Sequence, residues 1–300
     1  MTEYRAHFDS VVEFANGGSL RAEGFRLDLP SAVVAERDVA RLFVQHLGLA
    51  LVGSVTITGL RIVEEQHRGS RGIDTQLHAG RGRLVDLSHT IHAGLVTYPG
   101  LPVPVITPYL TREDSTARYA PGTQFAMDMI TMIGNTGTYI DSPWHRYEGG
   151  TDLAGLDLDT LVDQPAEIFH LRDISARGVG AEQLYDRDVR EKAVLLDTGW
   201  SRHFGVPAYL AGAPFLTAEG ADYLVDQGVT MVGIDSLNID DTESGGERPA
   251  HSALLAAGIH VIEHLTNLAV LPPSGSTVTV VPPKVEGFGT FPVRAFARLP

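Results

Sequence analysis

The chain of 300 residues is predicted to have an α/β fold, and three features of its sequence indicate this. Two short apolar segments, 194–196 and 231–234, have the composition of strands buried inside a sheet. Each segment ends in a polar turn, and a stretch with helical punctuation separates the two. A smaller N-terminal segment, residues 1–65, combines strand-like and helix-like patterns. Strands and helices that alternate in this way are typical of the α/β class.

The N-terminal segment 1–65 is predicted to form a β-β-α-β unit. Residues 11–14 and 20–29 are strand-like, and the turn 16–18 joins them. This turn has the sequence Asn-Gly-Gly, which accepts the positive φ that a hairpin needs. Apolar and polar residues alternate across 55–58, as they do in a half-buried strand.

Capping residues mark two predicted helices. Ser31 is a candidate N-cap for the helix of the N-terminal unit, and Gly48 can end that helix. Thr217 can cap a second helix, which Gly228 would stop. The tail from 277 to 300 contains several prolines and predicts edge strands and turns.

Residues 66–83 are glycine-rich and basic and contain little that could be buried. We interpret them as a linker between the N-terminal unit, 1–65, and a larger domain, 84–300. A long surface loop inside a single domain is the alternative. The chain length allows one large domain or two smaller ones.

The composition excludes several classes of protein. With 43% hydrophobic and 20% charged residues, the chain is typical of a soluble globular protein. The formal net charge of −14 disfavours nucleic-acid binding, because the phosphate backbone would repel most of the surface. No apolar run approaches the roughly 18 residues that span a membrane, and the N-terminus lacks an apolar secretory signal. Without cysteine there are no disulfides or thiolate metal sites, and a cytoplasmic location is the simplest expectation.

The segment 135–145 carries the strongest indication of chemistry. If its chain is extended, Asn135, Tyr139 and Asp141 face one side, and His145 follows just beyond the turn at Pro143. These side chains together can bind a ligand, coordinate a cation or transfer protons. The alternative is a polar turn whose side chains satisfy their own backbone.

This segment resembles the signature of the metal-dependent cyclase family, which includes bacterial kynurenine formamidases and isatin hydrolase. That signature is His-x-Gly-Thr-His-x-Asp-x-Pro-x-His. The chain keeps five of its positions, as Gly137, Thr138, Asp141, Pro143 and His145. Asn135 and Tyr139 stand where the family has its first two histidines. The resemblance extends over roughly 84–300, through segments at 85–88, 98–100, 195–200, 232–236, 251–255 and 263–268.

The resemblance implies a swivelling β/β/α architecture for the larger domain and a homo-oligomer, either a dimer or a tetramer. It also implies one divalent ion, zinc or manganese, on Asp141, His251 and Glu263. The position of a second ion is weakened, because the amide of Asn135 and the phenol of Tyr139 are poorer ligands than imidazole. The alternative is a metal-free site in which the acidic residues and His251 form a hydrogen-bonded cluster.

The same resemblance implies the role of His145, and side-chain chemistry indicates those of the remaining site residues. His145 takes the place of the proton-transfer residue, because imidazole exchanges protons near neutral pH. Tyr139 and Asn135 are expected to steady the substrate. An aromatic wall for a flat substrate is expected from Tyr98, Trp144 and Trp200, with core packing as the alternative for each.

The expected function is that of a hydrolase that opens a C–N bond of a small amide, formamide or lactam with metal-activated water. One alternative is a metal-independent cyclase or dehydratase that uses acid–base chemistry of Tyr139 and His145. Another is a binding protein that has lost catalysis. The acidic segment with Asp240, Asp241 and Glu243 is interpreted as a solvated loop that could act as a lid.

Overall fold

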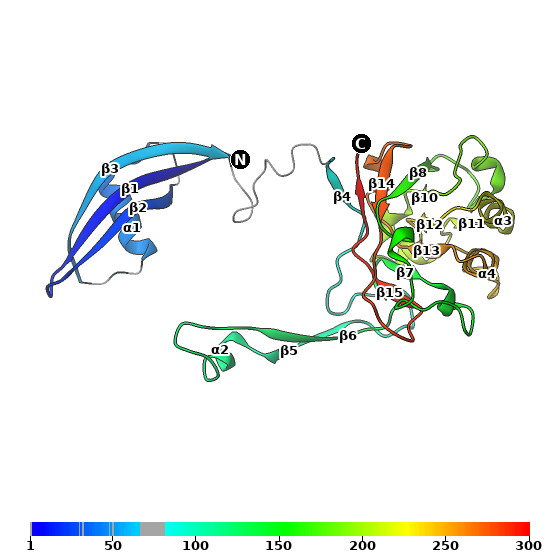
Figure 1. Ribbon diagram of the computed structural model, residues 1–300, viewed down its shortest axis with the longest axis horizontal. Helices are drawn as coiled ribbons and strands as arrows, with labels where there is room; N and C mark the ends of the chain where they lie inside the picture. Colours follow the sequence, from blue (N-terminus) through cyan, green and yellow to red (C-terminus); the bar gives the residue numbers. More distant parts are fainter. Residues whose placement is uncertain (1, 30, 32, 48, 50, 67–81) are drawn as a thin grey trace. The chain divides into compact units, whose positions relative to one another are not determined.

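The computed structural model describes residues 2–29, 31, 33–47, 49, 51–66 and 82–300 (Figure 1). Contacts divide the chain into two units, Met1–Ala79 and Gly80–Pro300. Most of the predicted linker, 66–83, lies outside the described residues, and the two-domain assignment stays a prediction. The expected homo-oligomer also stays a prediction.

The N-terminal unit is an antiparallel sheet with one helix, in the predicted order β-β-α-β. Its strands are β1 (Thr2–Phe14), β2 (Ser19–Leu29) and β3 (Val52–Gln66), and β1 lies in the centre of the sheet. Helix α1 (Glu36–His46) buries Val39 and Phe43, and the ring of Phe43 packs edge-on against those of two other phenylalanines, Phe8 and Phe25. Three aromatic rings therefore form much of a small core.

The predicted N-cap of this helix is wrong. Helix α1 begins at Glu36, and Ala35 precedes it without a side-chain cap. The hydroxyl of Ser31 instead donates to the carbonyl oxygen of Val33 at 3.0 Å. Serine often satisfies its own turn in this way, and a cap read from composition alone cannot exclude it.

The larger unit contains a nine-stranded mixed sheet with the order β15-β7-β13-β12-β10-β8-β14-β16-β4. Four neighbouring strands in its centre are parallel: β8 (Gln164–His170), β10 (Ala193–Asp197), β12 (Met231–Ile234) and β13 (His260–Glu263). The flanking strands are antiparallel: β4 (Leu84–Asp86), β7 (Tyr139–Asp141), β14 (Ser276–Thr279), β15 (Thr290–Pro292) and β16 (Phe296–Arg298). The predicted α/β class is confirmed.

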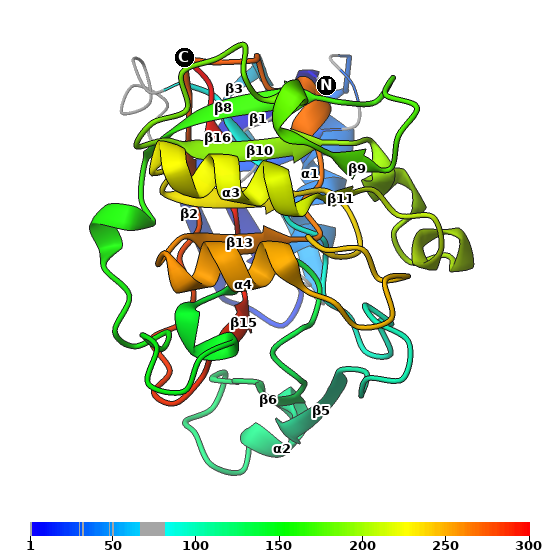
Figure 2. The same ribbon diagram turned by 90° about the vertical axis from the view of Figure 1, so that its right-hand side faces the viewer.

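Both faces of this sheet are buried. Along β10, Leu195 belongs to one apolar cluster, and its neighbours Val194 and Leu196 belong to another. Successive side chains of a strand point to opposite faces, so β10 has a core on each side. Helices α3 (Ala218–Gln227) and α4 (Pro249–Ala256) lie side by side over one face (Figure 2). Strands buried on both faces explain the continuous apolar segments of the sequence.

The capping residues of α3 agree with prediction. The hydroxyl of Thr217 accepts a hydrogen bond from the backbone N–H of Gly220 at 3.1 Å. Gly228 ends the helix in the left-handed conformation at φ 66°. The prediction of edge strands in the tail is right only for β15, because β14 and β16 lie inside the sheet. No proline falls within β14 or β16, so their ladder N–H groups are intact.

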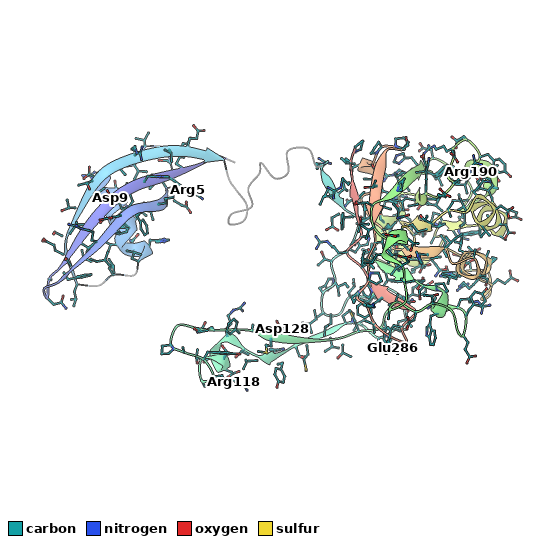
Figure 3. All side chains as sticks on the ribbon, viewed as in Figure 1. Arg5, Asp9, Arg118, Asp128, Arg190 and Glu286 are labelled. Carbon is teal, nitrogen blue, oxygen red and sulfur yellow. The ribbon has the colours of Figure 1, made fainter. Side chains whose placement is uncertain are left out.

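Two smaller pairs of strands complete the larger unit. Strands β9 (Gly178–Val179) and β11 (Phe215–Leu216) form a short parallel pair. Strands β5 (Val105–Leu110) and β6 (Met127–Thr131) form an antiparallel ribbon, and α2 (Arg112–Ser115) lies between them in the chain. Figure 3 shows Asp128 on strand β6 of this ribbon and Arg118 in the segment that connects α2 to β6.

Candidate active site

The candidate site lies where β7, β13 and α4 meet, at the side of the sheet that ends in β15. In the register of these strands, Tyr139 pairs with Glu263, and Asp141 pairs with Thr290 of β15. Tyr139 and Asp141 are two residues apart and therefore point to the same face of β7. Helix α4 adds His251 from the sequence just before β13.

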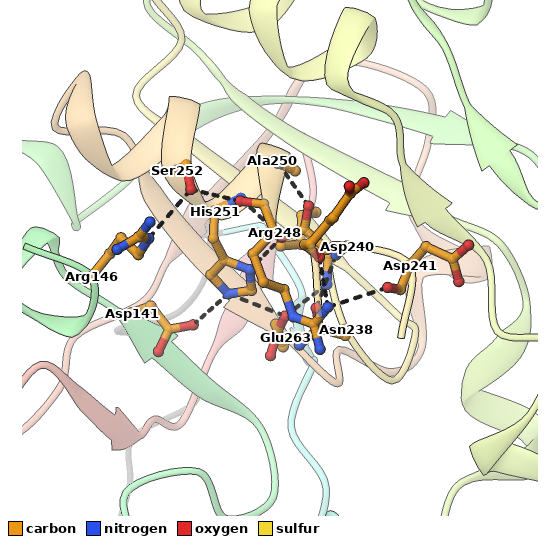
Figure 4. Close-up of polar contacts among 12 residues, drawn as sticks. Asp141, Arg146, Asn238, Asp240, Asp241, Arg248, Ala250, His251, Ser252 and Glu263 are labelled. Carbon is orange, nitrogen blue, oxygen red and sulfur yellow. Dashed lines mark hydrogen bonds and ion pairs between the residues drawn. The ribbon is translucent and has the colours of Figure 1, made fainter. Parts of the chain in front are cut away.

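The structure brings together the three residues expected to hold an ion (Figure 4). His251 Nε2 lies 3.5 Å from Asp141 Oδ2 and 3.6 Å from Glu263 Oε1. Ligand atoms about 3.4 Å apart surround an ion with bonds of about 2.1 Å in tetrahedral geometry. Within the described residues, Asp141 Oδ2 is buried without a hydrogen-bond partner. The spacing of His251 Nε2 from each of the two carboxylates therefore fits that of ligands on one divalent ion.

His145 lies at the edge of the same cluster. One ligand atom from each of Asp141, His145 and His251 lies within 4.8 Å of the others. Glu263 lies within this distance of His251 but does not belong to the mutually close group, and its carboxylate accepts two hydrogen bonds, from the hydroxyl of Tyr139 and from the backbone N–H of Ile239. A carboxylate has about four lone-pair positions, so these bonds leave room for a cation.

Asp240 holds the imidazole of His251 on its Nδ1 side. Its Oδ2 lies 2.7 Å from His251 Nδ1, and its two oxygens accept the backbone N–H groups of Ala250 and His251. Such a carboxylate orients a ligating imidazole and leaves Nε2 free for an ion. The interpretation of Asp240 as part of a solvated loop is wrong, because only 2% of this residue is exposed. The sequence signal that could have indicated this role of Asp240 is the helix start at Pro249, since acidic residues often cap helix N-termini.

The charges of the cluster favour a cation. Burial lowers the pKa of His251, but the neighbouring carboxylates of Asp141, Asp240 and Glu263 outweigh this and raise the pKa to about 10. Burial, together with the negative charge of Asp141, raises the pKa of Glu263 to about 7. Without a metal ion, a proton on His251 supplies the positive charge that the carboxylates require. A divalent ion supplies the same compensation at the same place.

Tyr139 occupies a signature position of histidine and behaves as a hydrogen-bond donor. Its hydroxyl donates to Glu263 Oε2. Burial and the negative charges of Glu263 and Asp141 raise the pKa of Tyr139 well above its ordinary value. The phenol therefore stays protonated at neutral pH when no ion is bound, and a protonated phenol is a poor metal ligand. Asn135 hydrogen-bonds with the Tyr139 side chain and lines the same cavity.

Thr290 links His145 to Asp141, and no pattern in the sequence indicates this link. The Thr290 hydroxyl donates to Asp141 Oδ1 and lies 2.7 Å from His145 Nδ1. A hydroxyl has a single proton, and the carboxylate accepts it. His145 therefore donates its Nδ1–H to Thr290, and Nε2 of the imidazole is left as an acceptor.

A cavity of about 670 Å³ opens onto this cluster. Its wall includes Tyr98, Leu101 and Ile133, beside Tyr139, His145 and His251. Tyr98 thus lies where an aromatic wall was expected. Trp144 and Trp200 are not among the residues that line the cavity. Trp144 is 42% exposed, and the indole of Trp200 donates to the carbonyl oxygen of Tyr209 at 3.0 Å.

The fold and this cluster define a protein of the cyclase class. The family described as "Putative cyclase" matches residues 85–241, and the chain belongs to this family. Its kynurenine formamidase relative from Geobacillus thermodenitrificans is 29% identical over 216 residues, which are 71% of this chain and 96% of the relative. The kynurenine formamidase of Bacillus cytotoxicus is 29% identical over 181 residues, 60% of this chain and 81% of the relative.

Solved structures of the same fold are also similar. One is described as a potential metal-dependent hydrolase with cyclase activity; it has a TM-score of 0.59 and 27% identity, and the match covers 73% of this chain and 99% of the other. Isatin hydrolase A from Labrenzia aggregata, bound to benzyl benzoate, has a TM-score of 0.64 and 21% identity over 75% of this chain and 96% of its own. The predicted family and architecture are confirmed. Among the helices of the described residues, none has the length and hydropathy needed to cross a bilayer.

Proposed function

We propose that the protein is a metal-dependent hydrolase that opens a C–N bond of a small amide, formamide or lactam. One observation carries the proposal: His251 Nε2 lies 3.5 Å from a carboxylate oxygen of Asp141 and 3.6 Å from one of Glu263. The formamidase relatives support the C–N bond as the target. A zinc or manganese ion held there would polarise the substrate carbonyl and lower the pKa of water.

The protein's own residues move the proton. Nε2 of His145 accepts the proton of the attacking water, since its Nδ1 is engaged with Thr290. The same atom then gives the proton to the leaving nitrogen. Tyr139 holds Glu263 through its hydroxyl, so we assign this residue to positioning of the carboxylate rather than to the substrate. Asn135, in the cavity wall, orients the substrate amide.

Metal content and turnover of two variants test the proposal. Protein purified without a metal-affinity tag is treated with chelator and then titrated with zinc or manganese, and the release of amine from an aryl formamide and the opening of a lactam are followed. We expect about one equivalent of bound ion and activity that depends on it. His251→Ala should lose both the ion and the activity. His145→Ala should keep the ion and lose about 100-fold or more in kcat.

Three results would contradict the proposal. Less than about 0.1 equivalent of ion, with no gain in activity on adding zinc or manganese, would exclude a metal enzyme. Activity that survives chelation but fails with His145→Ala would indicate acid–base chemistry alone. Thermal stabilisation by ligands without any turnover would indicate a binding protein.

A further inference from the structure

Two arginines at the mouth of the cavity carry charges that no carboxylate neutralises. Arg146 follows directly after His145, and Arg248 precedes α4, three residues before His251; both line the cavity. In the view of Figure 4 their side chains lie on either side of His251. The segments that supply His145 and His251 therefore each add a guanidinium group to the cavity.

The hydrogen bonds of these two arginines are all to neutral groups. Arg146 Nε donates to the hydroxyl of Ser252 at 3.3 Å. Arg248 Nη1 donates to the backbone carbonyls of Asp241 and Glu247 at 3.3 and 2.6 Å. Within the described residues neither guanidinium forms an ion pair, and each keeps several N–H groups without a protein partner. A guanidinium has five N–H groups in a planar fork that matches a carboxylate.

A shortage of acids does not explain the unpaired charges. The chain has 37 Asp and Glu against 23 Lys and Arg. Asp241 and Glu243 lie on the loop that precedes α4, and Arg177 forms ion pairs with both, at 2.7 and 2.9 Å. Arg248 contacts Asp241 at the backbone carbonyl oxygen and not at the carboxylate. Arg177 thus pairs with the acids of this loop, and the guanidinium group of Arg248 remains available to the cavity.

We propose that the substrate carries a carboxylate, which Arg146 and Arg248 bind at the mouth while the C–N bond lies at the inner cluster. The inference rests on the proposed hydrolysis and specifies its substrate class. Charge-assisted hydrogen bonds to a carboxylate are about twice as strong as neutral ones, and they fix orientation. Anchoring one end of the substrate presents its amide carbonyl to the cluster around His251. The exposed Glu247 also lines the mouth and opposes an anion, which provides a control of opposite sign.

Matched substrates and variants test this inference in the metal-loaded full chain. The substrates are aryl formamides with a ring carboxylate and the same compounds with a carboxamide in its place. We expect kcat/KM to favour the carboxylate by about 10- to 100-fold. Arg146→Gln and Arg248→Gln should each reduce this preference, mainly through KM, and the double variant should nearly abolish it. Glu247→Gln should raise the preference. Arg190→Gln, at a surface arginine paired with Asp188, should leave it unchanged (Figure 3).

Binding of benzoate and benzamide, measured by calorimetry, separates this inference from the proposed function. Equal turnover of both substrates, with no response to the arginine variants, would overturn the carboxylate assignment and leave the hydrolase intact. Absence of turnover, together with benzoate binding that the arginine variants weaken and benzamide binding that is negligible, would overturn the hydrolase and support the anion site. Equal binding of benzoate and benzamide to every variant would also overturn the anion site.

Discussion

The two ends of β13 carry buried ionisable groups in opposite states. At the carboxyl end, Glu263 and the adjoining His251 form part of an acidic cluster, and the pKa of His251 is raised to about 10. At the amino end, burial lowers the pKa of His260 to about 4. Both imidazoles are nearly inaccessible, with 6% and 5% of their surface exposed. Because the two residues are buried to nearly the same extent, the difference between their pKa values comes from their partners.

The partners at the two ends are of different kinds. His251 faces three carboxylates, those of Asp141, Asp240 and Glu263. His260 Nε2 lies 2.9 Å from the hydroxyl of Thr160, and its Nδ1 has no partner among the described residues. Ligand sites of open α/β sheets lie at the carboxyl ends of parallel strands, whereas the opposite ends serve the core. The carboxyl end of β13 is thus built for a cation, and the amino end for a neutral ring.

The largest effect is expected from a variant that adds histidine ligands to the acidic cluster at the carboxyl end of β13. Replacing Asn135 and Tyr139 together by histidine supplies two nitrogen donors beside Asp141, in place of an amide and a protonated phenol. We expect the bound ion to rise from about one to about two equivalents, measured by elemental analysis after titration with zinc.

Tyr139→Phe is the matched control for this gain. It removes the hydroxyl bonded to Glu263 without adding a ligand, so the protein should still bind about one equivalent. A double-histidine variant that folds normally yet binds no additional ion would contradict the view that residues 135 and 139 alone suppress the second ion.

A smaller effect is expected from the hydroxyl that links His145 to the cluster. Thr290→Val keeps the shape of the side chain and removes the group between Asp141 Oδ1 and His145 Nδ1. Loss of a fixed tautomer and orientation should lower kcat by about 10- to 100-fold, with KM and metal content nearly unchanged. Thr290→Ser restores the hydroxyl and should recover most of the rate. Equal rates for the valine and serine variants would show that the methyl group, and not the hydroxyl, matters.

Local sequence signals predicted much of the fold. Apolar segments located β10 and β12, and Thr217 and Gly228 bounded α3, because strands buried on both faces and helix caps depend on neighbouring residues alone. Asp141, His251 and Glu263 came from a family pattern and do converge in space. Their roles in binding an ion stay predictions.

The residues that support this trio could not be predicted in the same way. Thr290 meets Asp141 across 149 positions of sequence, through the pairing of β15 with β7. Asp240 looked like a surface acid because its neighbours in the chain are acidic, and only the docking of α4 buries it. Ser31 is of a residue type that often caps helices, but no helix begins there. Positions set by long-range pairing leave no periodic trace in a single sequence.

The smallest effect is expected at the amino end of β13. The pKa of His260 is lowered to about 4 in the folded protein, below the ordinary histidine value of 6.5. Below pH 6.5 the unfolded chain binds a proton that the folded protein excludes, so stability falls as the pH drops from 6.5 towards 4 and is constant above that range. Between pH 7.5 and 5.5 the cost is about 1.4 kcal/mol.

His260→Gln removes this titration and keeps a donor for Thr160. Chemical denaturation at the two pH values, applied to both proteins, isolates the contribution, because other buried histidines titrate equally in each. We expect the wild-type protein to lose about 1.4 kcal/mol more than the variant on acidification. Equal losses in the two proteins would mean that the amino end of β13 accommodates a charged ring. The difference between His251 and His260 could then not be attributed to their partners.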